Sequence, residues 1–341
     1  MSQRGPKPGD DFRPRHFRRT SGEVLVAIRR RRRVLVAGIP LGGVSVLIFS
    51  RSSFRLLIVG SLALAACEKP RTASSAVTDD FGDSVRFGTA PTRIVSLNPA
   101  TTELLFAIGA GSRLVGRSQF DLWPDSAKLV PSVGMGLQPN VEAVLGTRPD
   151  LVILYASLDN RPAVARFRAA GVGTLALRTD HISDFRRTVE LLGAILKDSV
   201  RAKNVADSVT RTLDSVRIAT KGLPRPTVFW QIWDAPLITI GAGSFLSELV
   251  DIAGGRNVYA DIPRPSVTVS LEDVAKRTPD FILAGPQGTQ KIKDDRRWRI
   301  VPAVRDGKVL VVDTVLVGRP SVRLGEAAVS LANLLHPGAL H

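Results

Sequence analysis

Hydrophobic residues in the middle of the chain alternate between short continuous runs and stretches with helical spacing. The run at 93–97 is followed by Asn98 and Pro99, and Gly109 closes the helical stretch that comes next. An N-cap Asn, a Pro at the first helical position and a Gly after the last turn bracket a helix. The run at 151–155 has the uninterrupted hydrophobicity of a parallel strand covered on both faces. Since strand and helix patterns alternate in this way, the sequence predicts an α/β fold.

One helix-and-strand segment recurs 130 residues later in the chain. Residues 141–154 read as a helix, a Pro-Asp pair and an apolar strand, and residues 271–283 repeat this order. Glu142 and Glu272 stand seven residues before the Pro of each copy. Pro-Asp before a buried strand also occurs by chance, but the same Gly-to-strand order follows both copies. The repeat predicts two similar lobes.

A long helix is predicted between the lobes. Hydrophobic residues keep helical spacing from Ser199 to Lys221, and Gly222 and Pro224 end the pattern. A helix of this length spans about 34 Å, so it can cross from an N-terminal lobe at 91–197 to a C-terminal lobe at 223–341 through a connecting helix at 198–222. The alternative is two unrelated helices within one lobe. A helical crossover is stiffer than paired strands, which predicts a small closing motion.

Ligands of α/β proteins bind at the carboxyl ends of the strands, which here places a ligand cleft between the two lobes. The loops that follow strands therefore supply the candidate binding residues. These are Asn98, Pro99, Phe120, Trp123, Gly136, Leu137, Tyr155, Trp233, Arg264 and Arg319. Trp123, Tyr155 and Trp233 carry large rings with polar tips that can stack on a broad ligand. The alternative for the tryptophans is that they anchor loops to the core.

The positive charge of the chain is concentrated at its N-terminus. Residues 1–66 contain 13 Lys and Arg against 3 Asp and Glu, which is +10 of the chain's net +16. The rest carries +6 and lacks a basic run with interleaved aromatics, so the charge gives little support to nucleic-acid binding.

Cys67 is the one cysteine of the chain, and it follows the uncharged segment 56–66 directly. Arg51 and Arg55 precede that segment, and its length suits a signal-peptide h-region rather than a membrane span. We expect a basic leader and lipoprotein signal over 1–66, an acylated Cys67, a flexible tether over 67–90 and a periplasmic or cell-surface location. Anchoring in the inner or the outer membrane is left open. A second apolar run at 34–49 leaves two alternatives, a transmembrane anchor or a true translation start near Val44 or Val46.

Other chemistries have weaker signals. Downstream of Cys67 only His181, His336 and His341 are histidines, too few for a metal-ion receptor, and we expect no metal site. An anchored hydrolase would need a nucleophile elbow, and no Gly-x-Ser-x-Gly is present. The sequence therefore indicates a binding protein rather than an enzyme, with no catalytic cofactor.

Four segments resemble the cobalamin-type, helical-backbone periplasmic binding proteins of ABC importers. They are Arg93-Ile94-Val95-Ser96-Leu97-Asn98-Pro99-Ala100-Thr101-Thr102-Glu103-Leu104, Val133 to Glu142 with Arg148 to Val152, Gly241 to Phe245 with Ala253 to Val258, and Arg319-Pro320 with Arg323-Leu324. The resemblance covers about 93–337, with the motifs in the family's order. It implies two lobes joined by a long helix and a monomer that delivers its ligand to a permease dimer with its ATPase.

The resemblance also implies roles for particular residues. Glu142 and Glu272 match the glutamates that pair with permease arginines. The cobalamin-binding members have Trp where this chain has Gly136 and Leu137, and Pro-Trp-Pro where Arg264 stands here. Arg264 and Arg319, with Arg323, could meet anionic groups. The expected ligand is cobalamin or another corrinoid, with haem or a ferric siderophore as the alternative.

Overall fold

The computed structural model describes residues 76–339, which belong to one compact unit. The predictions for the leader at 1–66, for Cys67 and for the run at 34–49 lie outside the described residues. Among the residues described, no helix is both long enough and apolar enough to cross a bilayer.

The N-terminal lobe is built on a four-stranded parallel sheet with the order β4-β3-β5-β6. Its strands are β3 (Ile94–Ser96), β4 (Leu114–Arg117), β5 (Leu151–Tyr155) and β6 (Gly173–Leu177). Its helices are α2 (Pro99–Ala107), α3 (Val141–Gly146), α4 (Arg161–Ala169) and α5 (Ile182–Leu196), with 3-10 turns η1 (Gly111–Arg113), η2 (Asp125–Leu129) and η3 (Leu158–Asn160). All three residues of β3 and the first four of β5 are buried, as expected for parallel strands covered on both faces.

Helix α2 begins and ends where the sequence predicts. The Asn98 side chain accepts a hydrogen bond from the Ala100 N–H at 3.0 Å, and Pro99 is the first helical residue. Gly109 follows the last turn with φ +85°, a left-handed conformation that favours glycine. The cap at Asn98 and Pro99 therefore fixes the loop that joins the carboxyl end of β3 to the start of α2.

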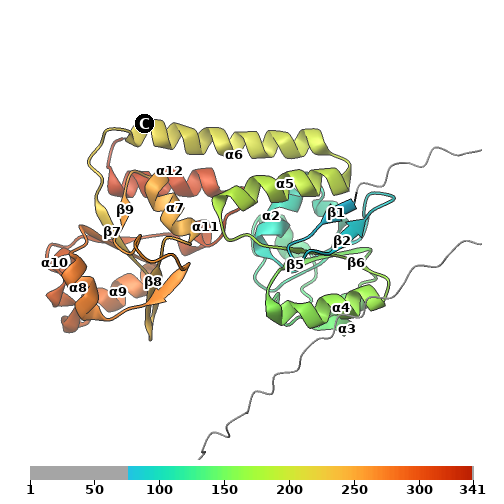
Figure 1. Ribbon diagram of the computed structural model, residues 1–341, viewed down its shortest axis with the longest axis horizontal. Helices are drawn as coiled ribbons and strands as arrows, with labels where there is room; N and C mark the ends of the chain where they lie inside the picture. The colour runs from blue at the N-terminus through green and yellow to red at the C-terminus, as the bar shows by residue number, and fades with distance from the viewer. Residues whose placement is uncertain (1–75, 340–341) are drawn as a thin grey trace, which may run out of the picture. The chain divides into compact units, whose positions relative to one another are not determined.

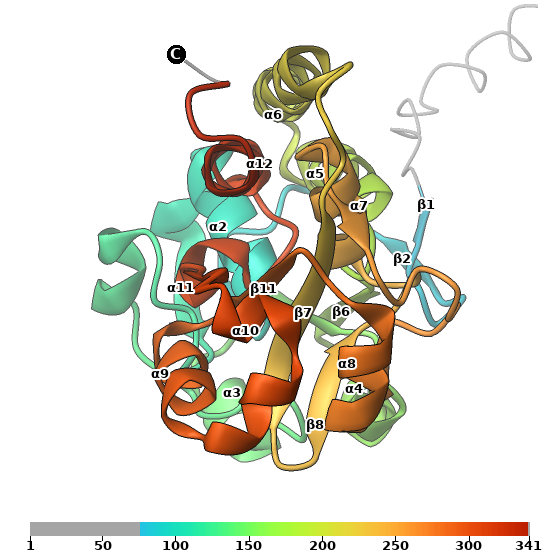
Figure 2. The same cartoon turned by 90° about the vertical axis from the view of Figure 1, so that its left-hand side faces the viewer.

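The C-terminal lobe contains a mixed sheet with the order β10-β8-β7-β11-β12, and β9 also pairs with β7. Its strands are β7 (Thr227–Asp234), β8 (Leu237–Ile240), β9 (Arg256–Asn257), β10 (Ser266–Thr268), β11 (Phe281–Ala284) and β12 (Val309–Val311). Its helices are α7 (Phe245–Ile252), α8 (Leu271–Arg277), α9 (Pro286–Asp294), α10 (Pro302–Arg305), α11 (Thr314–Val317) and α12 (Leu324–Leu335), with the 3-10 turn η4 (Arg296–Ile300). Strands β7, β11 and β12 are parallel, whereas β8 runs antiparallel to β7, a difference from the first lobe. Figure 2 looks onto this lobe, with α8 and α9 on either side of its central strands.

The predicted repeat is present as α3 with β5 and α8 with β11. In both copies the Asp after the proline accepts a 2.7 Å hydrogen bond from the backbone N–H of a threonine at or just before the start of the neighbouring strand. Asp150 binds Thr92 and Asp280 binds Thr227 in this way, and each carboxylate also binds the hydroxyl of the same threonine. Each Asp thus ties a helix-to-strand turn to the adjacent parallel strand.

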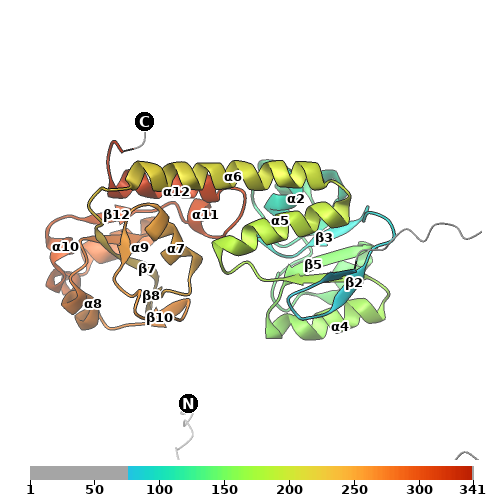
Figure 3. The ribbon, with the colours of Figure 1, turned by 45° about the horizontal axis from the view of Figure 1, so that its top comes forward.

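Helix α6 (Ser199–Thr220) has 22 residues and connects the lobes. It packs against α5 of the N-terminal lobe and α12 of the C-terminal lobe, and the three helices lie together (Figures 1 and 3). One hydrophobic core cluster runs through this layer and includes Leu105, Val209 and Leu331. The connecting helix is therefore part of the core of both lobes.

Residues 76–90 do not form the flexible tether that the sequence predicts. Strands β1 (Ala76–Thr78) and β2 (Ser84–Arg86) make an antiparallel hairpin. Asp79 in its turn is buried and pairs with Arg168 at 3.1 Å, while Asp80 pairs with Arg187 at 2.9 Å. The short strand that the sequence indicates at 84–87 is present as β2. The prediction of a tether was wrong for the rest of the hairpin because the two arginines that pair with it lie far away in the sequence.

Candidate functional site

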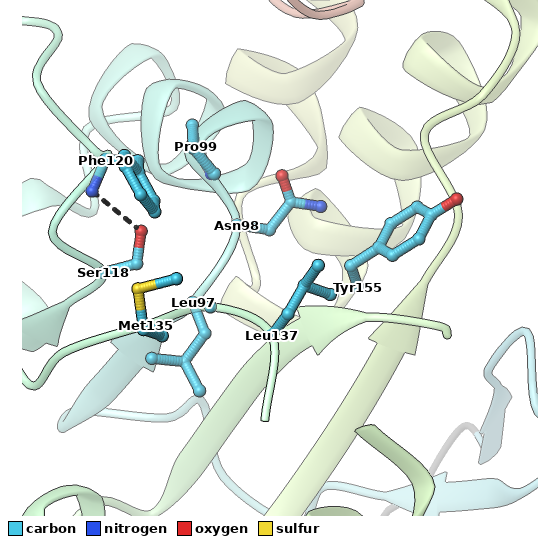
Figure 4. Close-up of a pocket in the computed structure, with 9 residues that line it drawn as sticks. Leu97, Asn98, Pro99, Ser118, Phe120, Met135, Leu137 and Tyr155 are labelled. Carbon is cyan, nitrogen blue, oxygen red and sulfur yellow. Dashed lines mark hydrogen bonds between the residues drawn. The ribbon is translucent and has the colours of Figure 1, made fainter. Parts of the chain in front are cut away.

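A hollow of about 310 Å³ opens at the carboxyl ends of β3, β4 and β5 (Figure 4). Its lining residues are Leu97, Asn98, Pro99, Ser118, Phe120, Met135, Gly136, Leu137 and Tyr155. Six of these nine were candidates from the sequence. Leu97 and Ser118, which stand directly before predicted loops, and Met135, which lies within one, were not among the candidates. We call this hollow the N-lobe pocket.

The lining of the N-lobe pocket is almost entirely apolar. Phe120, Met135 and Leu137 each expose about half of their side chains, at 52%, 46% and 49%. Large apolar side chains left open to water at a concave site mark a binding surface. The pocket therefore offers a ligand a broad apolar contact.

The loop that carries Phe120 is fixed by a buried carboxylate. Asp121 accepts hydrogen bonds from the hydroxyls of Ser118 and Thr102, both at 2.5 Å. Burial raises the pKa of Asp121 above its ordinary value, and these hydrogen bonds act in the opposite direction. Phe120 is therefore presented by a rigid loop.

The loop that carries Gly136 and Leu137 lies unusually close to β3. A Cβ atom on Gly136 would stand 2.2 Å from the carbonyl oxygen of Leu97, so only glycine fits there. The buried Asn160 side chain holds the same loop by hydrogen bonds to Gly136 O at 3.1 Å and from Gln138 N at 2.9 Å. At Gly136, where the resembled family has Trp, the main chain of the loop thus packs directly against the end of β3, and no aromatic ring is present.

Tyr155 closes one side of the N-lobe pocket. Its hydroxyl donates to Asp180 at 2.6 Å, and burial together with that carboxylate raises the pKa of Tyr155 to about 12. The phenol therefore stays protonated at neutral pH, with its proton directed at Asp180.

A second hollow, of about 640 Å³, lies at the carboxyl ends of β7 and β11. Its lining includes Gln231, Ile232, Trp233, Asp234, Leu246, residues 285–288, Lys291 and Thr314. Trp233 is 60% exposed, and its Nε1 donates to Ala235 O at 3.0 Å. Asp234 and Lys291 form an ion pair at 2.5 Å. We call this hollow the C-lobe pocket.

Three predicted residues lie outside both pockets. Arg264 is exposed in the loop before β10. Arg319 donates from Nε to the buried Glu103 at 2.5 Å, and Ser321 donates to the same carboxylate. The guanidinium carbon of Arg323 stands over the ring of Trp123, 5.4 Å from the centroid of that ring. Arg319 and Glu103 therefore join the two lobes.

A second polar contact between the lobes involves His181, the N-cap of α5. Its Nδ1 lies 2.7 Å from Glu248 Oε1 on α7, and Glu248 also accepts from Ile182 N at 3.3 Å. The hydrogen bond to Glu248 raises the pKa of His181 above its ordinary value, and Asp184 and Asp180 add to this. The pair is thus charged over a wider pH range than free imidazole.

This pair predicts a pH-dependent stability. A raised folded-state pKa stabilises the protein fully below the ordinary imidazole pKa of about 6.5, and the contribution is lost as pH rises through the raised value. Because both side chains are partly exposed, we expect His181→Gln to lower the free energy of unfolding by less than about 1 kcal/mol at about pH 5.5 and by nothing at about pH 9. Urea unfolding at both pH values measures this, and a difference that stays constant with pH would contradict it.

Glu142 and Glu272 lie in the first turns of α3 and α8, and both are exposed. Hydrogen bonding to backbone N–H groups lowers the pKa of both carboxyls, with Arg166 adding to the effect at Glu142 and Ser270 at Glu272. Both are therefore ionised at neutral pH. In Figure 1 both helices lie on the side of their lobes away from α6.

Within 76–339, no group of three His, Cys, Asp or Glu side chains is placed to hold a metal ion. The chemistry that the two pockets offer is apolar contact from the N-lobe, with a stacking ring, an ion pair and amide groups from the C-lobe.

Comparison with known proteins agrees with this geometry. The profile of the periplasmic binding protein family matches residues 94–316. The vitamin B12-binding protein of Vibrio vulnificus (strain CMCP6) is 26% identical over 242 residues, which are 70% of this chain and 89% of that protein. An ABC transporter substrate-binding lipoprotein of Bacillus subtilis (strain 168) is 26% identical over 301 residues, 82% of this chain and 95% of the relative. The crystal structure of the periplasmic vitamin B12 binding protein of Vibrio cholerae superposes with a TM-score of 0.65 at 25% identity, covering 72% of this chain and 97% of that one.

Proposed function

This chain belongs to the periplasmic binding protein family, the substrate-binding proteins of ABC transporters, and on that premise we propose that it delivers cobalamin or a related corrinoid to an ABC importer. The observation that carries the proposal is the apolar N-lobe pocket together with the exposed ring of Trp233. A corrin ring presents a broad surface that suits both.

The charge of the pockets favours a ligand without strong anionic groups. Three cations in or near the pockets are already paired: Lys291 with Asp234, Arg319 with Glu103, and Arg323 with Glu326 at 2.7 Å. Arg264 is exposed but lines neither pocket. Releasing one of these would leave its carboxylate without a partner. Haem propionates and acidic siderophores therefore fit less well than a ring fringed by amides.

Iron ligation also fits the pockets less well. Haem iron is held by His, Cys, Met or Tyr in proteins. Tyr155 lines the N-lobe pocket, but its hydroxyl donates a hydrogen bond to Asp180 and its pKa of about 12 opposes the phenolate. Met135 lines the same pocket, but the lining residues include no His to complete a Met/His pair. Haem and ferric siderophores remain the alternatives that the binding experiment separates from corrinoids.

The proposal predicts stoichiometric binding without turnover. We expect the mature protein to bind cyanocobalamin one to one in calorimetry and to release it unchanged, and Phe120→Ala to weaken binding about tenfold through lost ring contact. Leu129→Ala is the matched control, because Leu129 is 85% exposed and lies outside the N-lobe pocket. If the protein bound haemin or a ferric hydroxamate tightly and did not bind cyanocobalamin, the assignment of a corrinoid ligand would be rejected. Chemical conversion of the bound ligand would indicate that the protein is an enzyme.

Capture is proposed to proceed by a small closure of the lobes, followed by docking of a monomer on the permease dimer through Glu142 and Glu272. Two glutamates related by an internal repeat suit a symmetric partner. The helical connection through α6 favours a small movement over a wide one. Solution scattering that changed strongly on ligand addition would contradict this.

An acyl anchor at Cys67 completes the proposal and would hold the protein at the membrane surface. The sequence before Cys67 supports it, and the Bacillus relative is described as a lipoprotein. Mass spectrometry of the mature N-terminus tests it, since an unmodified cysteine there would exclude the anchor.

A further inference from the structure

Gln231 is a buried polar side chain whose carbonyl oxygen has no partner among residues 76–339. It lies in β7, is 7% exposed, and lines the C-lobe pocket. Its Oε1 accepts no hydrogen bond from any residue in 76–339. Because an unpaired buried acceptor destabilises a folded protein, such a group in a pocket indicates a donor supplied by something that binds there.

Unused donors lie beside this acceptor. Strand β11 pairs in parallel with β7, so the turn from β11 into α9 stands next to Gln231. The N-cap of α9 is Gly285, which has no side chain to cap the helix, and Pro286 opens the first turn. The N–H groups of a helix's first turn lack intrahelical partners, and here Gln287 and Gly288 of that turn line the same pocket.

Gly288 allows the side chain of Gln231 to approach the first turn of α9. A Cβ atom at this position would stand 2.7 Å from Gln231 Oε1. The partial positive charge of the helix N-terminus favours the carbonyl oxygen of the amide, rather than its NH₂, on the side facing α9. One acceptor and the donors of a helix start are therefore held side by side at one wall of the pocket.

We propose that this wall is a subsite for a carboxamide group of the ligand. The carboxamide oxygen accepts from the first-turn N–H groups of α9, and its N–H donates to Gln231 Oε1. A carboxylate or an ester could accept from the helix but has no proton for Gln231. The inference rests on the proposed function, since a corrin ring carries carboxamides around its edge, and it identifies Gln231 as a residue that selects amides over acids and esters.

The test compares two corrinoids that differ in this group. Dicyanocobinamide carries amide N–H groups, whereas the heptamethyl ester of dicyanocobyrinic acid keeps the ring and carbonyl oxygens without them. We expect the wild-type protein to prefer the amide by about ten- to a hundredfold. Gln231→Met, which keeps the length of the side chain but removes the acceptor, should lose that factor for the amide and leave ester binding unchanged. The ligand-free variant should also melt at a higher temperature than wild type, because it lacks the unpaired oxygen.

Thr188→Val is the matched control. Thr188 is fully buried in α5, its hydroxyl also lacks a partner among the described residues, and it lies outside both pockets. This variant should bind both corrinoids as wild type does. Gly288→Ala is a second test, since the added methyl displaces the Gln231 amide and should weaken amide binding selectively while favouring the helix.

Two outcomes separate this inference from the function on which it rests. Equal amide affinity in wild type and Gln231→Met, or an equal loss for amide and ester, would overturn the subsite and leave corrinoid binding standing. A wild-type protein that binds neither cyanocobalamin nor dicyanocobinamide would overturn the proposed function, and the subsite with it.

Discussion

Charge reversal at both Glu142 and Glu272 is expected to abolish uptake of the ligand while leaving its affinity unchanged. Both carboxylates are exposed and ionised at neutral pH, and both lie outside the two pockets. In the proposed complex, arginines at these positions would face arginines of the permease, so two attractions would become two repulsions, which costs several kcal/mol across an interface. Transport into cells or proteoliposomes, measured beside calorimetric ligand binding, separates the two effects.

A second double variant controls for the change in net charge. Glu190→Arg with Asp214→Arg alters the charge equally, but these exposed residues lie on α5 and α6, on the opposite side of the molecule from α3 and α8 (Figure 1). Uptake should persist in this control. Normal uptake by the Glu142→Arg, Glu272→Arg protein would reject the docking role.

Loss of the Glu103 carboxylate is expected to produce the largest fall in stability. Its side chain is 2% exposed and accepts from Arg319 at 2.5 Å and from Ser321, so it joins α2 to the loop before α12. Removing one member of a buried pair leaves the other charge without a partner, at a cost of about 3 kcal/mol. Chemical denaturation of Glu103→Ala should show this decrease in the free energy of unfolding.

Two further variants test the cause of this decrease. Glu103→Leu combined with Arg319→Met should recover most of the loss, because apolar replacement of both partners is often near neutral. Glu326→Ala removes a carboxylate that is 59% exposed and should cost less than about 1 kcal/mol. If Glu103→Ala is no less stable than Glu326→Ala, the two lobes are not joined through this pair.

The fold and most of the N-lobe pocket can be predicted from local sequence patterns. Continuous apolar runs, caps and the repeated Pro-Asp predict parallel strands, their helices and two lobes. The carboxyl ends of those strands then locate Asn98, Phe120, Leu137 and Tyr155 in one pocket. The runs and caps are readable because each depends on residues close together in the chain, and the repeat is readable because each of its copies is itself a local pattern.

The remainder depends on contacts between distant residues. Arg319 was predicted to face the ligand, but its partner Glu103 lies 216 residues away. The fold of the hairpin at 76–86 could not be predicted from nearby residues. Its ion-pair partners, Arg168 and Arg187, lie far from it in the sequence. Gln231 was missed because a polar residue inside an apolar strand gives no sign of whether its amide finds a partner.

The shared packing of α5, α6 and α12 has a consequence for how the protein unfolds. Its core residues come from both halves of the chain, so neither half can bury the apolar surface of this layer when the other is absent, although each lobe also has a core cluster of its own. Melting should therefore occur in a single cooperative step, and a gene truncated after the first lobe should yield an aggregating fragment. The two lobes are therefore expected to unfold as one unit.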